Sequence, residues 1–252
     1  FHHISIDEGL PNDRIRTMLI DSKQNIWAGT QGGGVFKFNL NSFITSSSNP
    51  ESDETLASMM VYSIHQDSKN NLWFANVAGE MCKYDGEQYT IIGKEQGLDY
   101  SDILEAISDH EDNLWIGTWG GLIKFDGKYF YVHNKESGLK HDRVFSVFED
   151  KNNNIWFLGY NSGLSKLDGK KITHYTLSDD SVQNSVLSVY EDSDGNLWFA
   201  TERLGICKYN EVGDTFTFYT ENEGLANNYV LSISEDRNKN IWASTANGAS
   251  RF

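Results

Sequence analysis

Cysteine, proline and long hydrophobic runs are scarce in this sequence of 252 residues. It contains two cysteines and two prolines, and two cysteines are too few to indicate an oxidising compartment. No window approaches the run of about 18 apolar residues that a membrane span needs, so we expect no direct membrane contact. Acidic residues outnumber basic ones 36 to 21, and the net charge of −15 argues against nucleic acid as a partner.

Aromatic residues and glycine are abundant, and both recur at a fixed spacing. A segment that begins with Asp, has Asn four residues later and Trp six residues later occurs six times. Its Asp residues are Asp21, Asp67, Asp109, Asp150, Asp192 and Asp236, and its Trp residues are Trp27, Trp73, Trp115, Trp156, Trp198 and Trp242. A period of just over 40 residues indicates a repeat architecture.

Each repeat reads as four short strands separated by turn residues. The fifth repeat shows them as VLSVYED at 186–192, LWFAT at 197–201, ICKY at 206–209 and FTFYT at 216–220. No segment has a sustained helical period. The sequence therefore predicts an all-β fold, a six-bladed β-propeller of four-stranded antiparallel blades that forms one domain over residues 1–252.

The two ends of the chain fit such a ring. FHHISIDEGL at 1–10 aligns without a gap on FTFYTENEGL at 216–225, the outer strand of a repeat, while the chain ends in the third strand of the sixth repeat. We therefore expect the N-terminal strand to complete the last blade and close the propeller. The alternative is that the six repeats are a fragment of a longer array.

Residues that repeat are expected to form the scaffold. Asp and Asn would cap a tight turn, and Trp would pack between neighbouring blades. Cys82 and Cys207 stand at equivalent strand positions and are expected to be buried. One cation per repeat is expected on a solvated blade surface: Lys37, Lys83, Lys124, Lys166, Lys208 and Arg251. The turns lack the bidentate Glu of a calcium loop, so no metal and no cofactor are expected.

Residues that do not repeat are the candidates for ligand binding. They lie in the loops that enter each first strand or join the second strand to the third, which share one face of a propeller. The entering loops supply Arg14, Tyr100, Asp102, His141, Arg143 and Tyr229. The second loops supply Trp119, Tyr160, Glu202 and Arg203, and Glu105 replaces the Ser or Thr of the other repeats in a first strand.

Two of these candidates stand out chemically. Trp119 is the single Trp outside the repeated position, and an exposed indole suits stacking on a sugar or another planar ligand. The alternative is that Trp119 packs on the next blade. Glu105 is a carboxylate among hydroxyls and needs a partner such as Arg14, Arg16, Arg143 or a ligand cation. His141 alone among the histidines reaches the variable face, so we predict a protein that is not an enzyme.

The repeats resemble those of the two-component regulator propeller family. The resemblance rests on EGLPNDRIRTMLIDSKQNIWAGTQGGGVFKF at 8–38 and on the joint spacing of EGL, D and N-[IL]-W in the other repeats. It implies the periplasmic sensing part of a hybrid histidine-kinase regulator that recognises a carbohydrate, such as an oligosaccharide, or another small ligand. The rest of a sensor-kinase chain, a second propeller or a second copy in a homodimer would then be its partner.

Two other functions stay open on the sequence. A propeller can also serve as a protein–protein interaction or dimerisation scaffold. In addition, NLWFATERLGICKYN at 196–210 is similar to the repeat of streptogramin B lyases, which are propeller enzymes. That resemblance implies a histidine and a metal on the variable face, where the sequence places His141 alone.

Overall fold

The structure is a computed structural model that describes residues 14–39, 45–47, 60–100, 102–159, 163–179 and 185–252. Within these ranges the regular elements are β-strands and one-turn 3-10 helices. No helix of the described residues is long and apolar enough to cross a membrane. The chain divides into two compact units, residues 1–133 and residues 134–252.

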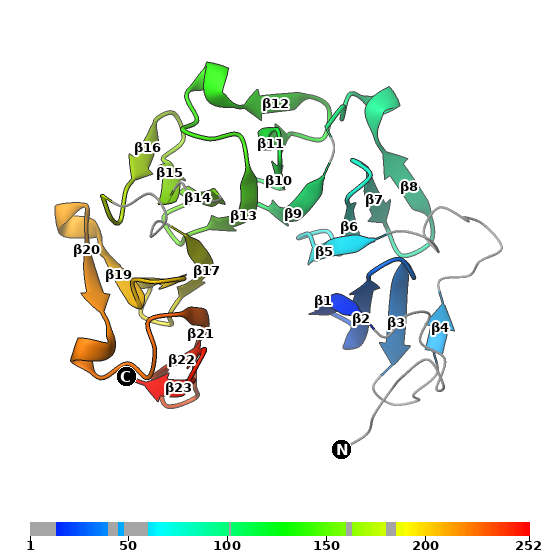
Figure 1. Ribbon diagram of the computed structural model, residues 1–252. Helices are drawn as coiled ribbons and strands as arrows, with labels where there is room; N and C mark the ends of the chain where they lie inside the picture. The colour runs from blue at the N-terminus through cyan, green and yellow to red at the C-terminus, as the bar shows by residue number, and fades with distance from the viewer. Residues whose placement is uncertain (1–13, 40–44, 48–59, 101, 160–162, 180–184) are drawn as a thin grey trace. The chain divides into compact units, whose positions relative to one another are not determined.

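The first unit contains three four-stranded antiparallel sheets, each a meander in chain order (Figure 1). Blade 1 is formed by β1 (Ile15–Ile20), β2 (Asn25–Thr30), β3 (Val35–Asn39) and β4 (Thr45–Ser47). Blade 2 is formed by β5 (Val61–Gln66), β6 (Leu72–Asn76), β7 (Met81–Tyr84) and β8 (Tyr89–Ile92). Blade 3 is formed by β9 (Ile103–Ser108), β10 (Leu114–Thr118), β11 (Gly121–Phe125) and β12 (Phe130–His133).

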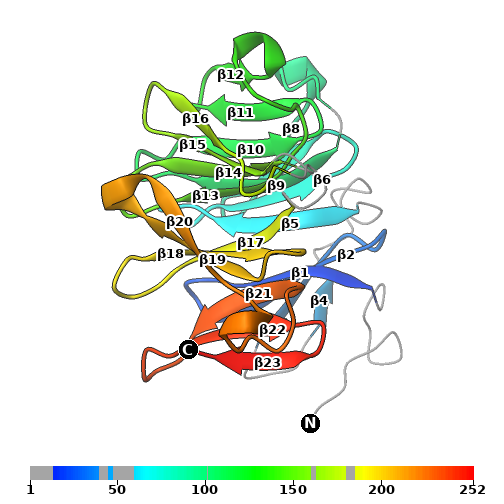
Figure 2. The same ribbon diagram turned by 60° about the vertical axis from the view of Figure 1, so that its left-hand side comes forward.

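The second unit continues the same pattern (Figure 2). Blade 4 is formed by β13 (Val144–Glu149), β14 (Ile155–Gly159), β15 (Gly163–Leu167) and β16 (Ile172–Tyr175). Blade 5 is formed by β17 (Val186–Glu191), β18 (Leu197–Thr201), β19 (Ile206–Asn210) and β20 (Thr215–Tyr219). Blade 6 has three described strands, β21 (Val230–Glu235), β22 (Ile241–Thr245) and β23 (Gly248–Arg251).

These six blades confirm the predicted fold, a six-bladed β-propeller. The expected closure by the N-terminal strand depends on residues 1–13, which lie outside the described residues. Short 3-10 helices, which the sequence analysis did not predict, precede three of the first strands, at Lys94–Gln96, Lys135–Ser137 and Glu221–Glu223. A capping box holds the one at Lys135–Ser137, where Asn134 accepts from the Ser137 amide and the Ser137 hydroxyl accepts from the Asn134 amide.

The repeated Asp organises the turn between the first two strands of every blade. In blade 4, Oδ1 of Asp150 accepts hydrogen bonds from the backbone N–H groups of Asn152 and Asn154, both at 2.9 Å. Its Oδ2 accepts a third from Nε1 of Trp156 at 2.7 Å. The predicted cap is confirmed, and the bond from the indole recurs in all six repeats at 2.7–2.9 Å.

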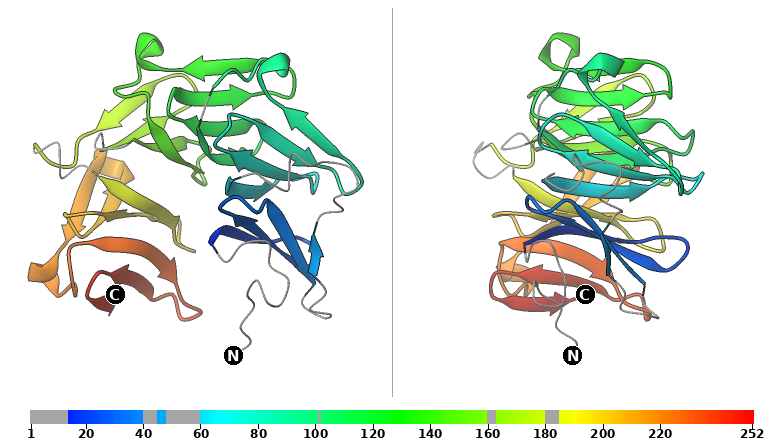
Figure 3. Two further views of the ribbon diagram at one scale, coloured as in Figure 1. Left: turned by 45° about the vertical axis from the view of Figure 1, so that its right-hand side comes forward. Right: turned by 90° about the vertical axis from the view of Figure 1, so that its right-hand side faces the viewer.

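Four of the repeated Trp residues also join their own blade to the next within a unit: Trp27, Trp73, Trp156 and Trp198. Trp27 packs with Ile64 and Phe74 of blade 2, and Trp156 lies 5.4 Å from Phe199 of blade 5 between ring centres. Within each unit, successive sheets are stacked face to face (Figure 3, left). The predicted packing between blades is therefore confirmed for these four residues, whereas Trp242 is 39% exposed.

The repeated lysines differ from their expected place on a solvated surface. Their ammonium groups lie over the Trp rings of the neighbouring strand, at 5.1 Å for Lys37 over Trp27 and 5.5 Å for Lys166 over Trp156. The cross-strand pairing of each Lys with its Trp produces this cation–π contact, which leaves the lysines half-buried. Cys82 and Cys207 are buried, as the sequence predicts, and neither forms a disulfide.

Candidate functional site

Four of the predicted ligand residues lie at one end of blade 3. Asp102 directly precedes β9 and Trp119 directly follows β10, and these strands pair so that Ile103 faces Thr118 and Glu105 faces Gly117. Tyr100 packs against Gly120, the residue after Trp119. We call this end of a blade, where the entering loop meets the loop between its second and third strands, the loop end.

A buried hydroxyl fixes the loop that carries Trp119. Oγ1 of Thr118 donates to the carbonyl of Gly121 at 2.9 Å and accepts from the N–H of Gly120 at 3.0 Å. An added Cβ on Gly120 would lie 2.9 Å from Cδ1 of Tyr100, so this close approach requires glycine. With its backbone held in this way, Trp119 is 52% exposed.

Asp102 has an unusual backbone conformation, with a φ of 58°. Among the described residues, the other non-glycine positions with positive φ lie in the repeated Asp turns or, as Asp214, in the β19–β20 hairpin. Asp tolerates this left-handed region better than most residues, although the conformation still carries local strain. The N–H of Asp102 donates to the carbonyl of Val77 at 3.0 Å, which anchors it to the loop end of blade 2.

The remaining predicted residues lie at the loop ends of their own blades. In blade 1, the carbonyl of Arg14 accepts from the N–H of Gln31 at 2.9 Å, so the entering loop and the second loop meet as predicted. In the second unit, His141 and Arg143 are exposed just before β13, and the carbonyl of Tyr229 accepts from the N–H of Ala246 at 3.0 Å. Tyr160 lies outside the described residues.

The electrostatics of these loop ends are mixed. Arg203 and Tyr229 are exposed and Glu202 is half-buried, while the N–H of Glu202 is held at 3.0 Å by the carbonyl of Ser185. Although His141 is exposed, slight desolvation of its ring and the ammonium groups of Lys135 and Lys140 lower the pKa of His141. Among the described residues no group of three His, Cys, Asp or Glu side chains is arranged to hold a metal ion.

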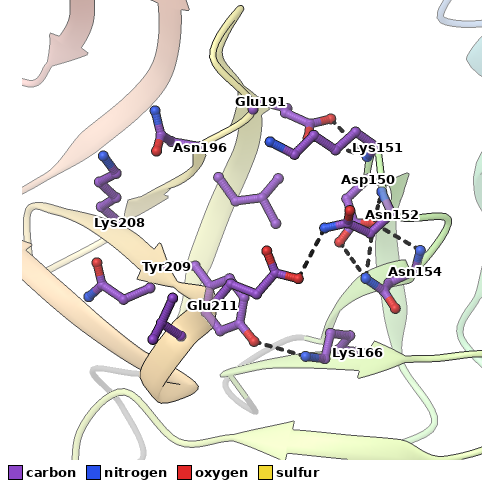
Figure 4. Close-up of a pocket in the computed structure, with 14 residues that line it drawn as sticks. Asp150, Lys151, Asn152, Asn154, Lys166, Glu191, Asn196, Lys208, Tyr209 and Glu211 are labelled. Atoms are coloured by element: carbon purple, nitrogen blue, oxygen red, sulfur yellow. Dashed lines mark hydrogen bonds between the residues drawn. The ribbon is translucent and has the colours of Figure 1, made fainter.

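A second concave site, which the sequence analysis missed, lies at the opposite end of blades 4 and 5 (Figure 4). We call this end, which carries the Asp turns, the turn end. The groove there has a volume of about 390 Å³, whereas the corresponding groove between blades 1 and 2 has about 70 Å³. Its polar lining residues are Asp150, Lys151, Asn152, Asn154, Lys166, Glu191, Asn196, Lys208, Tyr209, Asn210 and Glu211.

The sequence did contain a signal for this groove. The β19–β20 hairpin turns through EVGD at 211–214 with a 3-10 helix, whereas blades 2, 3 and 4 turn through Asp-Gly pairs. The extra residues bring Oε1 of Glu211 to 3.2 Å from Nδ2 of Asn152 in the Asp turn of blade 4. A departure from the repeat at the turn end therefore enlarges one groove between blades.

The family model of the two component regulator propeller matches five segments of this chain, residues 9–32, 55–78, 138–161, 180–203 and 224–247. Each segment runs from an entering loop through the Asp turn to the second loop. The chain belongs to the two-component regulator propeller family. The five matched segments do not include the third repeat, which contains Tyr100, Asp102, Glu105 and Trp119.

Solved structures resemble the fold over essentially the whole chain. The extracellular domain of a hybrid two-component system from B. thetaiotaomicron matches with a TM-score of 0.76 and 22% identity over 100% of this chain and 35% of that one. A second such domain from the same organism matches with a TM-score of 0.60 and 18% identity over 94% and 38%. A streptogramin B lyase matches with a TM-score of 0.72 and 11% identity over 96% and 80%.

These likenesses concern the fold and the share of each protein that matches. At identities of 11–22% they show a shared propeller architecture. The chain spans little more than a third of the length of the two extracellular domains. A comparison with curated proteins found no match.

Proposed function

We propose that this propeller is a ligand-sensing module of a two-component regulator and that it binds a carbohydrate or another small ligand at the loop end of blade 3. The observation that carries the proposal is the divergence of the third repeat. The first, second, fourth, fifth and sixth repeats match the family model, whereas the third repeat has an exposed Trp119, an adjoining Tyr100 and an Asp102 with a left-handed backbone conformation. Positions that depart from a repeated scaffold are where binding specificity is placed.

The chemistry of this loop end suits a hydroxylated ring. The indole of Trp119 offers an apolar face on which a sugar ring can stack. The carboxylate of Asp102 accepts hydrogen bonds from hydroxyl groups, and charge-assisted bonds of this kind are the stronger ones. Because the Thr118 hydroxyl and the Val77 carbonyl fix both loops, the site is largely formed before the ligand arrives.

The wider setting follows from the family. We infer a periplasmic location and a role without catalysis, in which ligand binding is passed to the rest of a sensor-kinase chain, to a second propeller or to a second copy. The extracellular domains of the hybrid two-component systems support this setting, since they share the fold. The similar fold of the lyase does not by itself favour an enzyme, because one fold supports many chemistries.

A thermal-shift screen of the chain against oligosaccharides and small metabolites tests the proposal. A ligand at a hundred times its Kd should stabilise the chain by about 2.7 kcal/mol. Trp119→Ala should abolish the shift, whereas Tyr129→Ala, which removes an equally exposed aromatic from the outer part of blade 3, should preserve it. If every hit survives Trp119→Ala, the site is misplaced. If no compound shifts the melting temperature and sedimentation shows a dimer, the interaction scaffold replaces the sensor.

A further inference from the structure

We propose that His65 forms a pH-sensitive link between blades 2 and 3, which holds these blades together when His65 is neutral and loosens when His65 is protonated. The link lies toward the turn end, where β5 of blade 2 runs beside β9 of blade 3 (Figure 1). Both blades belong to the first unit. The link goes beyond the sensing function proposed above, because it needs no ligand and shares no residue with the loop-end site.

The hydrogen bonds of His65 fix its charge state. Its half-buried side chain faces blade 3, since it pairs across the sheet with Trp73, which packs against blade 3. Nε2 of His65 lies 2.9 Å from the backbone nitrogen of Ser108 and 2.6 Å from its hydroxyl oxygen. A backbone N–H can only donate, so Nε2 must accept and the ring proton lies on Nδ1. The link therefore requires neutral His65.

Blade 3 departs from the repeat at this contact. In three other contacts between neighbouring blades, a long side chain at the end of a first strand accepts the backbone N–H of the residue that follows the repeated Asp. These pairs are Gln66 with Ser22 at 2.8 Å, Glu191 with Lys151 at 3.2 Å, and Glu235 with Ser193 at 2.9 Å. Blade 3 has the short Ser108 at the corresponding position, and its N–H and hydroxyl bind His65 of blade 2 instead.

His65 also differs from its counterparts in the other repeats. The residues two positions before the repeated Asp are Leu19, His65, Ile107, Phe148, Tyr190 and Ser234. Among these side chains only the imidazole changes charge between pH 5 and pH 8. The histidine therefore makes the contact between blades 2 and 3 sensitive to pH at a position that is insensitive in the other blades.

The groups that surround His65 favour its neutral form. Burial lowers the pKa of His65 below its ordinary value of 6.5, and the nearby carboxylate of Asp67 opposes this effect without reversing it. Of the strands packed against β5, β2 and β6 carry no titratable side chain, and Glu105 lies on the opposite face of β9 from Ser108. His110, in the turn after β9, is exposed. Other charged groups nearby have partners of their own: Arg16 over Tyr62, Lys83 over Trp73, Asp109 with Trp115, Glu111 with Asn113, and Asp112 with Lys69.

Protonation turns the acceptor of this link into a donor. The new N–H at Nε2 of His65 would face the backbone N–H of Ser108, and two donors repel each other. The Ser108 hydroxyl can rotate and accept from the imidazolium, but the backbone N–H cannot, so it loses its acceptor. Because the folded state lowers the pKa of His65, the link stabilises the fold fully above about pH 6.5 and is lost as the pH falls through the folded pKa.

NMR spectroscopy of the ¹⁵N-labelled 252-residue chain tests the link. At pH 7 the imidazole ¹H–¹⁵N correlations should show the Nδ1–H tautomer of His65. Between pH 7.5 and pH 4.5 the protection factor of the Ser108 amide against hydrogen exchange should fall about tenfold, because this amide loses its acceptor. The fall should follow the titration of the His65 ring signals. This range lies above the acid transition expected from the buried aspartates.

Two variants assign the pH dependence to His65. His65→Gln keeps an acceptor of similar reach but cannot titrate, so the protection of Ser108 should no longer depend on pH. His110→Gln is the matched control, because it removes an exposed histidine from the adjoining turn and should preserve the wild-type dependence.

Four results would overturn the proposal, and three of them need only the wild-type chain. These three are a proton on Nε2 of His65 at pH 7, a His65 ring that does not titrate above pH 4.5, and a constant protection of Ser108 while His65 titrates. The fourth is a His65→Gln protein in which the protection of Ser108 still falls as in the wild type.

Discussion

Nε1 of Trp156 donates a hydrogen bond of 2.7 Å to Oδ2 of Asp150, so one residue pair fixes both the turn of blade 4 and its packing on blade 5. The carboxylate is buried and also accepts two backbone N–H groups of its turn. The indole is fully buried between the two blades. Because the same pair recurs in every repeat, the six-residue spacing of Asp and Trp couples local turn formation to tertiary packing.

Removing the indole N–H while keeping an aromatic ring should therefore destabilise the fold. We expect Trp156→Phe to lower the free energy of unfolding by about 2 kcal/mol or more, because a buried carboxylate loses a hydrogen bond and the smaller ring leaves a void. Urea denaturation gives the value. Trp119→Phe, at a half-exposed indole, should change the stability by no more than about 0.5 kcal/mol. Equal losses in the two variants would contradict this role of Trp156.

The same carboxylates predict how stability depends on acid. Burial opposes ionisation of Asp192, but hydrogen bonds from Trp198 and Asn196 outweigh it and hold its pKa below the ordinary value of 3.8. A folded pKa below the unfolded one stabilises the fold fully above about pH 4. That contribution is lost as the pH falls through the folded pKa.

Melting temperatures measured from pH 7 down to pH 2 check this dependence. The wild-type melting temperature should fall steeply only below about pH 4. Asp192→Asn should lower the melting temperature at neutral pH and flatten the fall in acid, since its side chain no longer titrates. The exposed Asp99, which pairs with Lys94, offers the control Asp99→Asn. An unchanged acid slope in Asp192→Asn would rule out this source of the pH dependence.

Asp214 holds the hairpin that enlarges the groove between blades 4 and 5. Its Oδ1 accepts from the hydroxyls of Tyr175 at 2.6 Å and Tyr209 at 2.7 Å. We expect Asp214→Ala to cost about 1–3 kcal/mol of stability, because two largely buried hydroxyls lose their acceptor and Lys166 loses its anion.

Urea denaturation and hydrogen exchange of the β19–β20 amides measure this effect. Asp214→Asn should fall between wild type and Asp214→Ala, since it keeps one acceptor oxygen and tolerates the φ of 50° at this position. Faster exchange should be confined to this hairpin and the facing part of blade 4. If the stability of Asp214→Ala equals that of the wild type, the network does not hold the hairpin.

The repeated part of the fold was predictable because the residues that form the turn of each blade are close together in the sequence. Asp150, Asn154 and Trp156 lie in one short segment, so their contacts depend on local spacing that the sequence displays six times. The capping box around Asn134 and Ser137 was equally local and could have been recognised. Contacts of this kind follow from the sequence because few other arrangements satisfy the same backbone groups.

The candidate sites were less predictable because they join segments far apart in the sequence. Strand register placed Asp102 and Trp119 at one loop end correctly, but the packing of Tyr100 on Gly120 and the exposure of the indole depend on side-chain fit. The turn-end groove depends on how far the hairpin at Glu211 reaches toward Asn152. An unusual hairpin length signals such a groove without giving its shape or its charge pairing.

Gly120 offers a direct test of the loop end of blade 3. A methyl group at this position would lie 2.9 Å from Cδ1 of Tyr100, so Gly120→Ala must displace the ring or the loop. We expect a loss of stability of about 1–3 kcal/mol, typical of overpacking, together with loss of ligand-induced stabilisation. Gly213→Ala is the matched control, because its nearest contact is a Thr215 hydroxyl at 3.3 Å. Thermal melting with and without a screened ligand separates the two effects, and a Gly120→Ala protein that still responds to that ligand would exclude Tyr100 and Trp119 from its binding site.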